Sequence, residues 1–391
     1  MKNNIIESKL SEIGEFLLKY KCISNIALYG GDSGIVLFLA LYYKYSGDER
    51  YFQKMQECIE EILETINNAN YLHYSFAVGL AGWGWLLEYL NQHELVDIDR
   101  DSFLEDIDRY LEIQLDVCIE KENNDQLHGA IGIANYFLKR GIDIPVVKLL
   151  NRLNAKKEEE NGEYRWSEFH SLKAGKFYDF GLAHGMAGKL YFFRKCYEKG
   201  ICVAECAENI FGVNKFFLNN IQQNVGSYFP PSIPVESYQS KLEKHCRLAW
   251  CYGDPGVLYS LYRAANTVGN NELEELVIRM LENVSLRTTY EQTQIVDAGF
   301  CHGTAGVAHI YNRLYHHTKN DKFYQTASFW NNKSIEYSSK ASENCGFQFY
   351  DPENGWLNSK GVLTGISGVG LTFISFLSPS ISDWDECLLL S

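Results

Sequence analysis

The sequence has few prolines, no excess of positive charge and no long apolar run, and each shortage excludes a class of protein. Only 7 of the 391 residues are proline, against 26 tyrosines and 22 phenylalanines, which favours a compact globular chain over a disordered or fibrous one. The formal net charge is −14. Nucleic acid is therefore not an expected partner, because binding it requires lysine and arginine to neutralise phosphates. The most apolar run, residues 34–43, is far shorter than the roughly 20 residues of a membrane span.

The eleven cysteines lack the CxxC pairs of zinc fingers and the spacing of a disulfide framework. No apolar secretory core follows the first residues. We therefore expect reduced thiols, no transmembrane segment, and a cytoplasmic location, either free or at the membrane through a biosynthetic complex. The three cysteines over residues 196–206 fit the apolar stripe of one helix better than a metal site.

A Gly-x-x-Gly turn recurs seven times along the chain. Its period is roughly 50 residues, which is typical of repeat architectures. The first glycines of the seven turns are Gly31, Gly79, Gly129, Gly185, Gly253, Gly303 and Gly365. One such turn is no evidence of structure, but seven at a near-regular step indicate an internal repeat.

Each repeat contains two helical patterns of different character. A nearly uniform apolar segment, such as residues 35–43, follows each turn and predicts a helix buried on all sides. Amphipathic stretches, such as residues 52–66, predict half-exposed outer helices. Because buried inner helices favour a closed ring over an open solenoid, we predict an all-α fold, an α/α toroid of about seven helical hairpins. It forms one domain over residues 1–391, with short β or loop insertions near 155–180 and 220–245.

The turns precede the inner helices, so we expect all seven to gather at one mouth of the ring. Helix N-termini would present free N–H groups there and favour anionic groups. Cys251, Cys301 and His302 lie at or just before the fifth and sixth turns, where Gly303 would permit a sharp bend. Thiolate and imidazole are ligands that zinc prefers, and three of them leave a fourth position open. The sequence therefore predicts a Zn²⁺ site made by these three residues.

Further polar residues accompany the turns. His184 directly precedes the fourth turn, Asp125 lies four residues before the third, and Arg247 lies four before Cys251. Gathered in one cavity beside a metal, they form a plausible acid–base set. We interpret His128 as structural.

These motifs resemble those of the lanthionine synthetase cyclase family, called LanC and LanC-like proteins, from end to end. The resemblance rests on the seven turns, on Trp-Cys-Tyr-Gly at 250–253 and on Cys-His-Gly at 301–303. It implies an α/α toroid with one zinc held by Cys251, Cys301 and His302. It also implies catalytic-site roles for Asp125, His184, Arg247 and Tyr252. Some relatives carry a dehydratase domain before the cyclase; we expect this chain to be of the stand-alone type.

The resemblance implies a lanthionine synthetase that adds cysteine thiols of a dehydrated precursor peptide to dehydroalanine or dehydrobutyrine. A separate dehydratase and a transporter are the further partners it suggests. Two alternatives stay open at this point. One is a LanC-like zinc protein that transfers or binds a small thiol such as glutathione. The other is a carbohydrate-active enzyme with paired carboxylates, which is disfavoured because the turns carry Cys and His, with Asp32 and Asp254 as the main acids.

Overall fold

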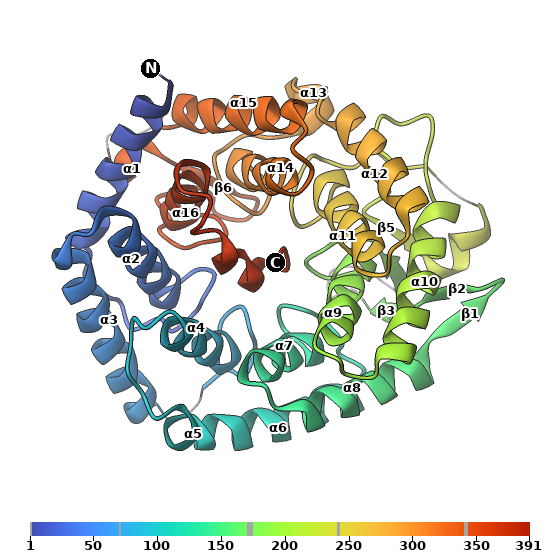
Figure 1. The fold of residues 1–391 in the computed structure, drawn as a ribbon, viewed down its shortest axis with the longest axis horizontal. Coiled ribbons are helices and arrows are strands. Elements are labelled where there is room, and N and C mark those ends of the chain that lie inside the picture. Colours follow the sequence, from blue (N-terminus) through green and yellow to red (C-terminus); the bar gives the residue numbers. More distant parts are fainter. Residues whose placement is uncertain (1, 70–71, 170–174, 241–242, 340–342) are drawn as a thin grey trace. The chain divides into compact units, whose positions relative to one another are not determined.

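The computed structural model describes residues 2–69, 72–169, 175–240, 243–339 and 343–391. Over these residues the long helices alternate strictly between an outer and an inner member (Figure 1). The outer helices are α1 (Lys2–Leu18), α3 (Glu49–Asn68), α6 (Glu105–Glu120), α8 (Asp143–Lys156), α10 (Val203–Asn219), α12 (Asn271–Val284) and α15 (Asp321–Tyr337). The inner helices are α2 (Asp32–Ser46), α4 (Leu80–Gln92), α7 (Ala130–Arg140), α9 (Met186–Glu198), α11 (Asp254–Thr267), α14 (Thr304–Thr318) and α16 (Ile366–Leu377). This alternation confirms the predicted repeat of an outer and an inner helix.

Short elements interrupt the hairpins. In the part of the chain that the structure describes, they are α5 (Arg100–Phe103), α13 (Tyr290–Thr293), the 3₁₀ helices η1 (Val235–Ser240), η2 (Asn344–Gly346) and η3 (Asp383–Leu388), and seven strands. The strands are β1 (Glu158–Glu160), β2 (Glu163–Arg165), β3 (Glu168–Phe169), β4 (Lys176–Asp179), β5 (Ser232–Pro234), β6 (Phe349–Asp351) and β7 (Gly355–Leu357). They form small antiparallel sheets ordered β1-β2, β3-β4-β5 and β6-β7. Five of the strands fall in the two predicted insertions, of which residues 170–174 and 241–242 lie outside the described residues.

The chain divides into two compact units. Unit 1 comprises residues 1–111, 295–389 and 391, and unit 2 comprises residues 112–294 and 390. In unit 1 the inner helices pack in the order α14, α16, α2, α4, so the last inner helix of the chain lies against the first (Figure 1). In unit 2 the order is α7, α9, α11. The prediction of one domain over the whole chain stays a prediction.

The inner helices are buried as their apolar sequences predict. Every residue from Asp32 to Tyr42 of α2, and from Leu80 to Leu90 of α4, is buried. The outer helix α3 instead buries a single stripe, consisting of Tyr51, Met55, Cys58 and Ile62. None of the helices among the described residues is both long and apolar enough to cross a membrane.

Each Gly-x-x-Gly turn places its first glycine at the N-cap of an inner helix. These glycines are needed for close approach and not for a left-handed backbone. A Cβ atom at Gly79 would lie 1.9 Å from the carbonyl oxygen of His73, and one at Gly303 would lie 2.4 Å from the amide nitrogen of Gly299. The loop before the turn therefore packs directly on the helix end, which leaves no room for a side chain.

The same loops cap the inner helices. The first helical N–H donates to the carbonyl seven residues earlier in α2 (Asp32 to Asn25, 2.7 Å), α4 (Leu80 to His73, 2.8 Å) and α7 (Ala130 to Asn123, 2.9 Å). The equivalent bonds in α14 and α16 measure 3.1 and 3.3 Å. At these five helix ends the prediction that the first N–H group is free is therefore wrong, because a carbonyl of the preceding loop accepts its hydrogen bond.

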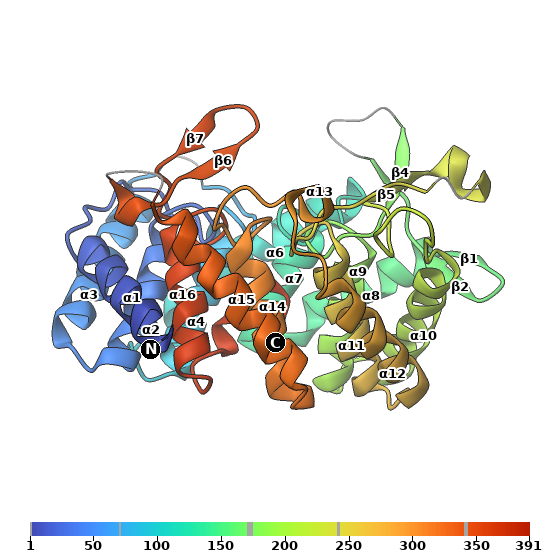
Figure 2. The same ribbon diagram turned by 90° about the horizontal axis from the view of Figure 1, so that it is seen from above.

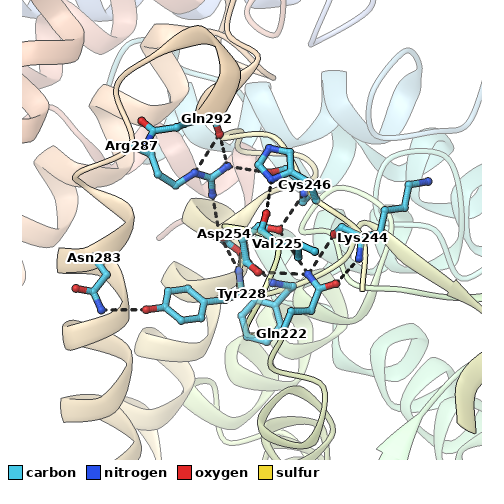
Figure 3. A network of polar contacts seen from close by, with 12 residues as sticks. Gln222, Val225, Tyr228, Lys244, Cys246, Asp254, Asn283, Arg287 and Gln292 are labelled. Atoms are coloured by element: carbon cyan, nitrogen blue, oxygen red, sulfur yellow. Dashed lines mark hydrogen bonds and ion pairs between the residues drawn. The ribbon is translucent and has the colours of Figure 1, made fainter. Parts of the chain in front are cut away.

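Asp32 and Asp254, the acids inside the turns, also fasten loops. Asp32 is fully buried and accepts hydrogen bonds from the Tyr20 hydroxyl (2.9 Å) and two backbone amides. Asp254, equally buried, accepts from the amides of Tyr228 and Phe229 (both 3.1 Å) and pairs with Arg287 at 2.8 Å (Figure 3). Both carboxylates are buried and hydrogen-bonded within their own unit. Neither is therefore an exposed acid of the kind that a paired-carboxylate hydrolase requires.

Candidate active site and metal centre

The candidate metal ligands occupy matching positions in two neighbouring repeats. Counting back from the first glycine of each turn, Cys251 and Cys301 are at position −2 and His302 is at position −1. One ligand atom from each of the three lies within 4.8 Å of the other two. Cys251 is 8% exposed, and the other two are half-buried. Two sulfurs and one imidazole nitrogen at this separation could hold a metal ion. Among the described residues, no other trio of His, Cys, Asp or Glu meets the same geometric test.

Backbone hydrogen bonds and a buried acid fix the loop that carries Cys301 and His302. The amide of Cys301 donates to the carbonyl of Leu363, at position −2 of the next turn (2.9 Å). Asp297, which is 2% exposed, accepts from the amides of Gly299 (2.8 Å) and Tyr350 (2.9 Å). Asp297 thereby ties the loop to strand β6, whose hairpin with β7 extends past the helices of unit 1 (Figure 2). These hydrogen bonds hold the loop that carries Cys301 and His302 in place.

The loop carrying Cys251 is joined to the preceding repeat. The carbonyl of Cys251 accepts from the amides of Leu182 (2.9 Å) and Ala183 (3.4 Å), directly before His184. A Cβ atom at Gly256 would lie 2.1 Å from the carbonyl oxygen of Trp250, so this turn is also tightly packed. The backbone therefore fixes His184 and Cys251 relative to each other.

His184 and Asp125 form a close pair. Nδ1 of His184 lies 2.6 Å from Oδ2 of Asp125, whose Oδ1 accepts from the amides of Leu127 (2.8 Å) and His128 (2.7 Å). Burial disfavours a charged imidazole, but Asp125, with help from Asp179 and Cys251, outweighs it and raises the pKa of His184. Burial also disfavours a charged Asp125, yet its hydrogen bond to His184 and the His128 amide lower its pKa. Each partner therefore stabilises the charged form of the other.

Three rings from position −1 of successive repeats lie nearly parallel in unit 2. The centroids of His128 and His184 are 6.4 Å apart with an interplanar angle of 16°. The centroids of His184 and Tyr252 are 5.8 Å apart at 26°. The imidazole of His184 thus lies near two other rings, and His128 contributes a ring contact to His184 as well as a backbone amide to Asp125.

Arg247 differs from the other predicted residues. It is exposed, and no ion pair between it and Asp125 occurs among the described residues, where Asp125 instead contacts His184 and backbone amides. Its guanidinium is therefore available to a bound molecule and is not a support for Asp125.

Sequence reasoning missed two acids, Asp179 and Asp297, which share position −6 of their turns. In five repeats the side chain at −6 accepts a hydrogen bond from the amide two residues later, as in Asx turns; the five residues are Asn25, His73, Asn123, Asp179 and Asp297. Aligning the repeats at position −6 would have revealed these polar residues in the sequence. It would not have revealed which group the second carboxylate oxygen of Asp179 or Asp297 contacts.

A sequence model of the family described as Lanthionine synthetase C-like protein matches residues 23–389. Among curated proteins, the nisin biosynthesis protein NisC of Lactococcus lactis subsp. lactis is 24% identical, with 94% of this chain and 89% of that protein covered. Glutathione S-transferase LANCL1 of Danio rerio is 22% identical, with 85% of this chain and 81% of that protein covered.

A solved structure of nisin cyclase matches with a TM-score of 0.76 at 21% identity, covering 98% of this chain and 96% of that one. Together with the alternating helices, this match confirms the predicted fold class, an all-α protein of the α/α-toroid type with short β insertions. The predicted family resemblance is confirmed by the model that spans residues 23–389.

Proposed function

The chain belongs to the lanthionine synthetase C-like family, and on that premise we propose that it is a zinc-dependent lanthipeptide cyclase. It adds cysteine thiols of a dehydrated precursor peptide to dehydroalanine or dehydrobutyrine, forming thioether rings. The observation that carries the proposal is the cluster of Cys251, Cys301 and His302, together with the Asp125–His184 pair that the Cys251 backbone fixes in place. The likeness to NisC over 94% of the chain supports the same assignment.

The donor set suits zinc, which favours thiolate and imidazole in a tetrahedral arrangement. When bound, zinc would supply a fourth position at which a substrate thiol loses its proton near neutral pH. Cys251, Cys301 and His302 would hold the ion. Because both cysteine ligands carry negative charge, a third thiolate would stay electron-rich and nucleophilic.

His184 acts as the general acid in this proposal. Attack of the substrate sulfur on the β-carbon forms the C–S bond and shifts the π electrons of the C=C bond into an enolate. The α-carbon must then gain a proton. Asp125 occupies Nδ1 of His184, so Nε2 is the nitrogen that can donate. The raised pKa of His184 keeps more of the imidazole protonated near neutral pH, as an acid requires. The proton lost from the thiol balances the one delivered to carbon, so the product is an isomer of the substrate.

The remaining residues bind and orient the peptide. The exposed Arg247 would stabilise the enolate oxygen, since a guanidinium is a fixed positive charge with several donors. Tyr252, half-buried beside His184, would orient the peptide. A separate dehydratase that prepares the substrate, a transporter that exports the product and a cytoplasmic location complete the proposal.

A synthetic peptide carrying one dehydroalanine and one cysteine tests this function. Incubated with zinc-loaded protein, it should lose its free thiol without a change in mass, which alkylation followed by mass spectrometry detects. The Cys301→Ala protein is the matched control and should leave the thiol at its uncatalysed rate of loss. Persistence of the thiol with the parent protein, accompanied by glutathione adducts when glutathione is added, would instead establish the small-thiol transferase.

A further inference from the structure

One buried position of the turns carries an apolar side chain in every repeat except the third. Position −3, counted back from the first glycine of each turn, is buried in all seven repeats. Six of the seven residues there are apolar, namely Leu28, Phe76, Leu182, Trp250, Phe300 and Val362. The third repeat has Gln126, which is 0% exposed. Because an apolar side chain suffices for the fold at this position, the glutamine requires a different explanation.

The side chain at position −3 packs against the second glycine of the following turn. A Cβ atom at Gly82 would lie 3.0 Å from Cβ of Leu28, and one at Gly188 would lie 2.5 Å from Nε2 of Gln126. The turns that contain Gln126 and Gly188 lie at the starts of α7 and α9, neighbouring inner helices of unit 2 (Figure 1). Gln126 therefore occupies the same place as its apolar counterparts, directly against the fourth turn.

Gln126 differs from its apolar counterparts because it donates a hydrogen bond to the next turn. Its Nε2 donates to the carbonyl oxygen of Gly185 at 3.0 Å. This contact fixes the orientation of the side-chain amide, because Oε1 in the same place would repel the carbonyl oxygen. Oε1 is buried and has no hydrogen-bond partner among the described residues. An unpaired buried acceptor is unfavourable for folding, so the glutamine carries a cost that a leucine here would not.

The fold does not need this bond to satisfy the carbonyl of Gly185. The same oxygen accepts from the amide of Lys189 in the first turn of α9, at 3.2 Å. The second turn has the equivalent helical bond, from Trp83 to Gly79 at 3.2 Å, although its residue at position −3, Phe76, has no side-chain donor. The bond from Gln126 is therefore an addition to the hydrogen bonding that these turns share.

The added bond lies next to the Asp125–His184 pair. Asp125 and Gln126 are consecutive in the chain, and so are His184 and Gly185. The first residue of each pair meets through the 2.6 Å contact between Oδ2 and Nδ1, and the second through the bond from Nε2 to the carbonyl. The carbonyl of Cys251 accepts from the two amides directly before His184. The backbone of His184 is thus held on its N-terminal side by the fifth repeat and on its C-terminal side by the third.

We propose that Gln126 is a positioning residue for the cyclisation, which fixes the placement of His184 against Asp125 by holding the carbonyl of Gly185. The inference rests on the proposed function for its kinetic consequence, whereas the effect of Gln126 on His184 can be measured without any reaction. Gln126 acts through His184 and is not itself a catalytic residue.

The repeats themselves supply the substitution. Gln126→Leu installs the residue that the first and fourth repeats have at position −3, and Gln126→Met installs an unbranched side chain of similar length. Both variants lose the donor to Gly185, and both also lose the unpaired Oε1. The melting temperature should therefore equal or exceed that of the parent. Leu28→Met is the matched control, because it changes a side chain at position −3 that donates no hydrogen bond.

The experiment compares these proteins, all zinc-loaded, on the dehydroalanine–cysteine peptide. Gln126→Leu and Gln126→Met should lower kcat roughly 10- to 100-fold with little change in KM, the scale of a small misplacement of a reacting group. Leu28→Met should keep the parent kcat. In a protein that already carries Asp125→Asn, Gln126→Leu should lower kcat by less than it does alone, because both changes act on His184. In NMR spectra of ¹³C-histidine-labelled protein, the His184 signals, assigned with His184→Ala, should shift in both Gln126 variants and not in Leu28→Met.

Several outcomes would overturn the inference. Parent kcat in both Gln126 variants with unmoved His184 signals would leave Gln126 as a packing residue. A raised KM with unchanged kcat would mean that it acts on peptide binding. Melting temperatures well below the parent's in both variants would mean that the bond serves the fold, and a full further loss in the Asp125→Asn protein would mean that the two residues act separately. If the parent protein itself fails to cyclise, the proposed function is wrong, while the NMR comparison still decides whether Gln126 acts on His184.

Discussion

Replacing Asp125 with asparagine removes one charge from the site and almost no volume. In the parent protein, Oδ1 of Asp125 accepts from the amides of Leu127 and His128, and Oδ2 faces Nδ1 of His184 at 2.6 Å. An asparagine oxygen can keep both backbone bonds. Its NH₂ group then faces Nδ1, which must become an acceptor. The imidazole is thereby driven into its neutral form, because a protonated Nδ1 would point at another donor.

The expected loss of activity is large, and the expected loss of stability is modest. A neutral imidazole is a very weak acid, so kcat should fall by about 10²–10⁴-fold, the usual contribution of a general acid. One hydrogen bond between charged, half-buried groups contributes only about 1.5–3 kcal/mol to folding. In a chain of this length, that shifts the melting temperature by roughly 2–4 °C. Zinc content should not change, because Asp125 is not among the three metal ligands.

The pH dependence of stability provides an independent measure of the same pair. Asp125 has a lowered pKa, so its stabilisation is present above its unfolded pKa of about 3.9 and is lost as pH falls through the folded value. His184 has a raised pKa, so its stabilisation is complete below about 6.5 and is lost as pH rises through the folded value. The pair therefore stabilises most between about pH 4 and 6.5.

Kinetics with the dehydroalanine–cysteine peptide and urea unfolding at several pH values check both expectations. The stability difference between parent and Asp125→Asn should be largest in the acidic window and smaller at pH 8. An Asp125→Asn protein that cyclises at the parent rate would refute the role of the pair in proton delivery. One that loses its zinc would place Asp125 in the metal site and not beside it.

Three more expectations test the site and its support. Cys301→Ala should lose bound zinc and activity together in metal analysis, whereas His184→Ala should keep zinc and lose about 10²–10⁴ in kcat; equal zinc loss in both would mean that acid and ligand are confused. Gly31→Ala should destabilise the fold by about 1–3 kcal/mol, because its Cβ would lie 2.4 Å from the Asn25 carbonyl oxygen, while Gly30→Ala, with open space around it, is the control in thermal unfolding. Arg287→Met should cost roughly 3–5 kcal/mol by leaving Asp254 buried without its partner, and a melting temperature equal to the parent's would contradict this account of the Asp254 network.

The repeat could be predicted because its signals are local. The start of each inner helix can be recognised in the sequence by its glycine, since a Cβ atom at Gly79 or Gly303 would collide with the preceding loop. The apolar run after each turn marks the inner helix in the same way. The clustering of Cys251, Cys301 and His302 could also be predicted, because the two cysteines occupy the same position of adjacent repeats. No comparable local signal reports which side chains meet across two loops.

The contacts that a polar side chain makes beyond its own turn could not be predicted from the sequence. Asp179 and Asp297 look alike at position −6, and both make the same turn bond at 2.8 Å. The second oxygen of Asp297 accepts from Tyr350 on a strand more than fifty residues later, whereas Oδ1 of Asp179 also lies against Gly185 of the fourth turn. These partners depend on how separate loops pack together. The expectation of free N–H groups was wrong at five helix ends for the same reason, because a rule about helix termini alone does not include the loop that accepts their hydrogen bonds.

The backbone pattern of the turns is compatible with the candidate metal ligands and the candidate proton donor at positions −1 and −2. At position −2 the backbone carries the structural bonds from one repeat to the next: Cys301 donates to Leu363, and Leu363 in turn donates to Tyr29. These bonds are independent of the side chain, since a cysteine, a leucine and a tyrosine all make them. The backbone bonds at position −2 are therefore compatible with different side chains in different repeats. Candidate metal ligands in two repeats and a candidate proton donor in a third are thus carried by one recurring backbone pattern.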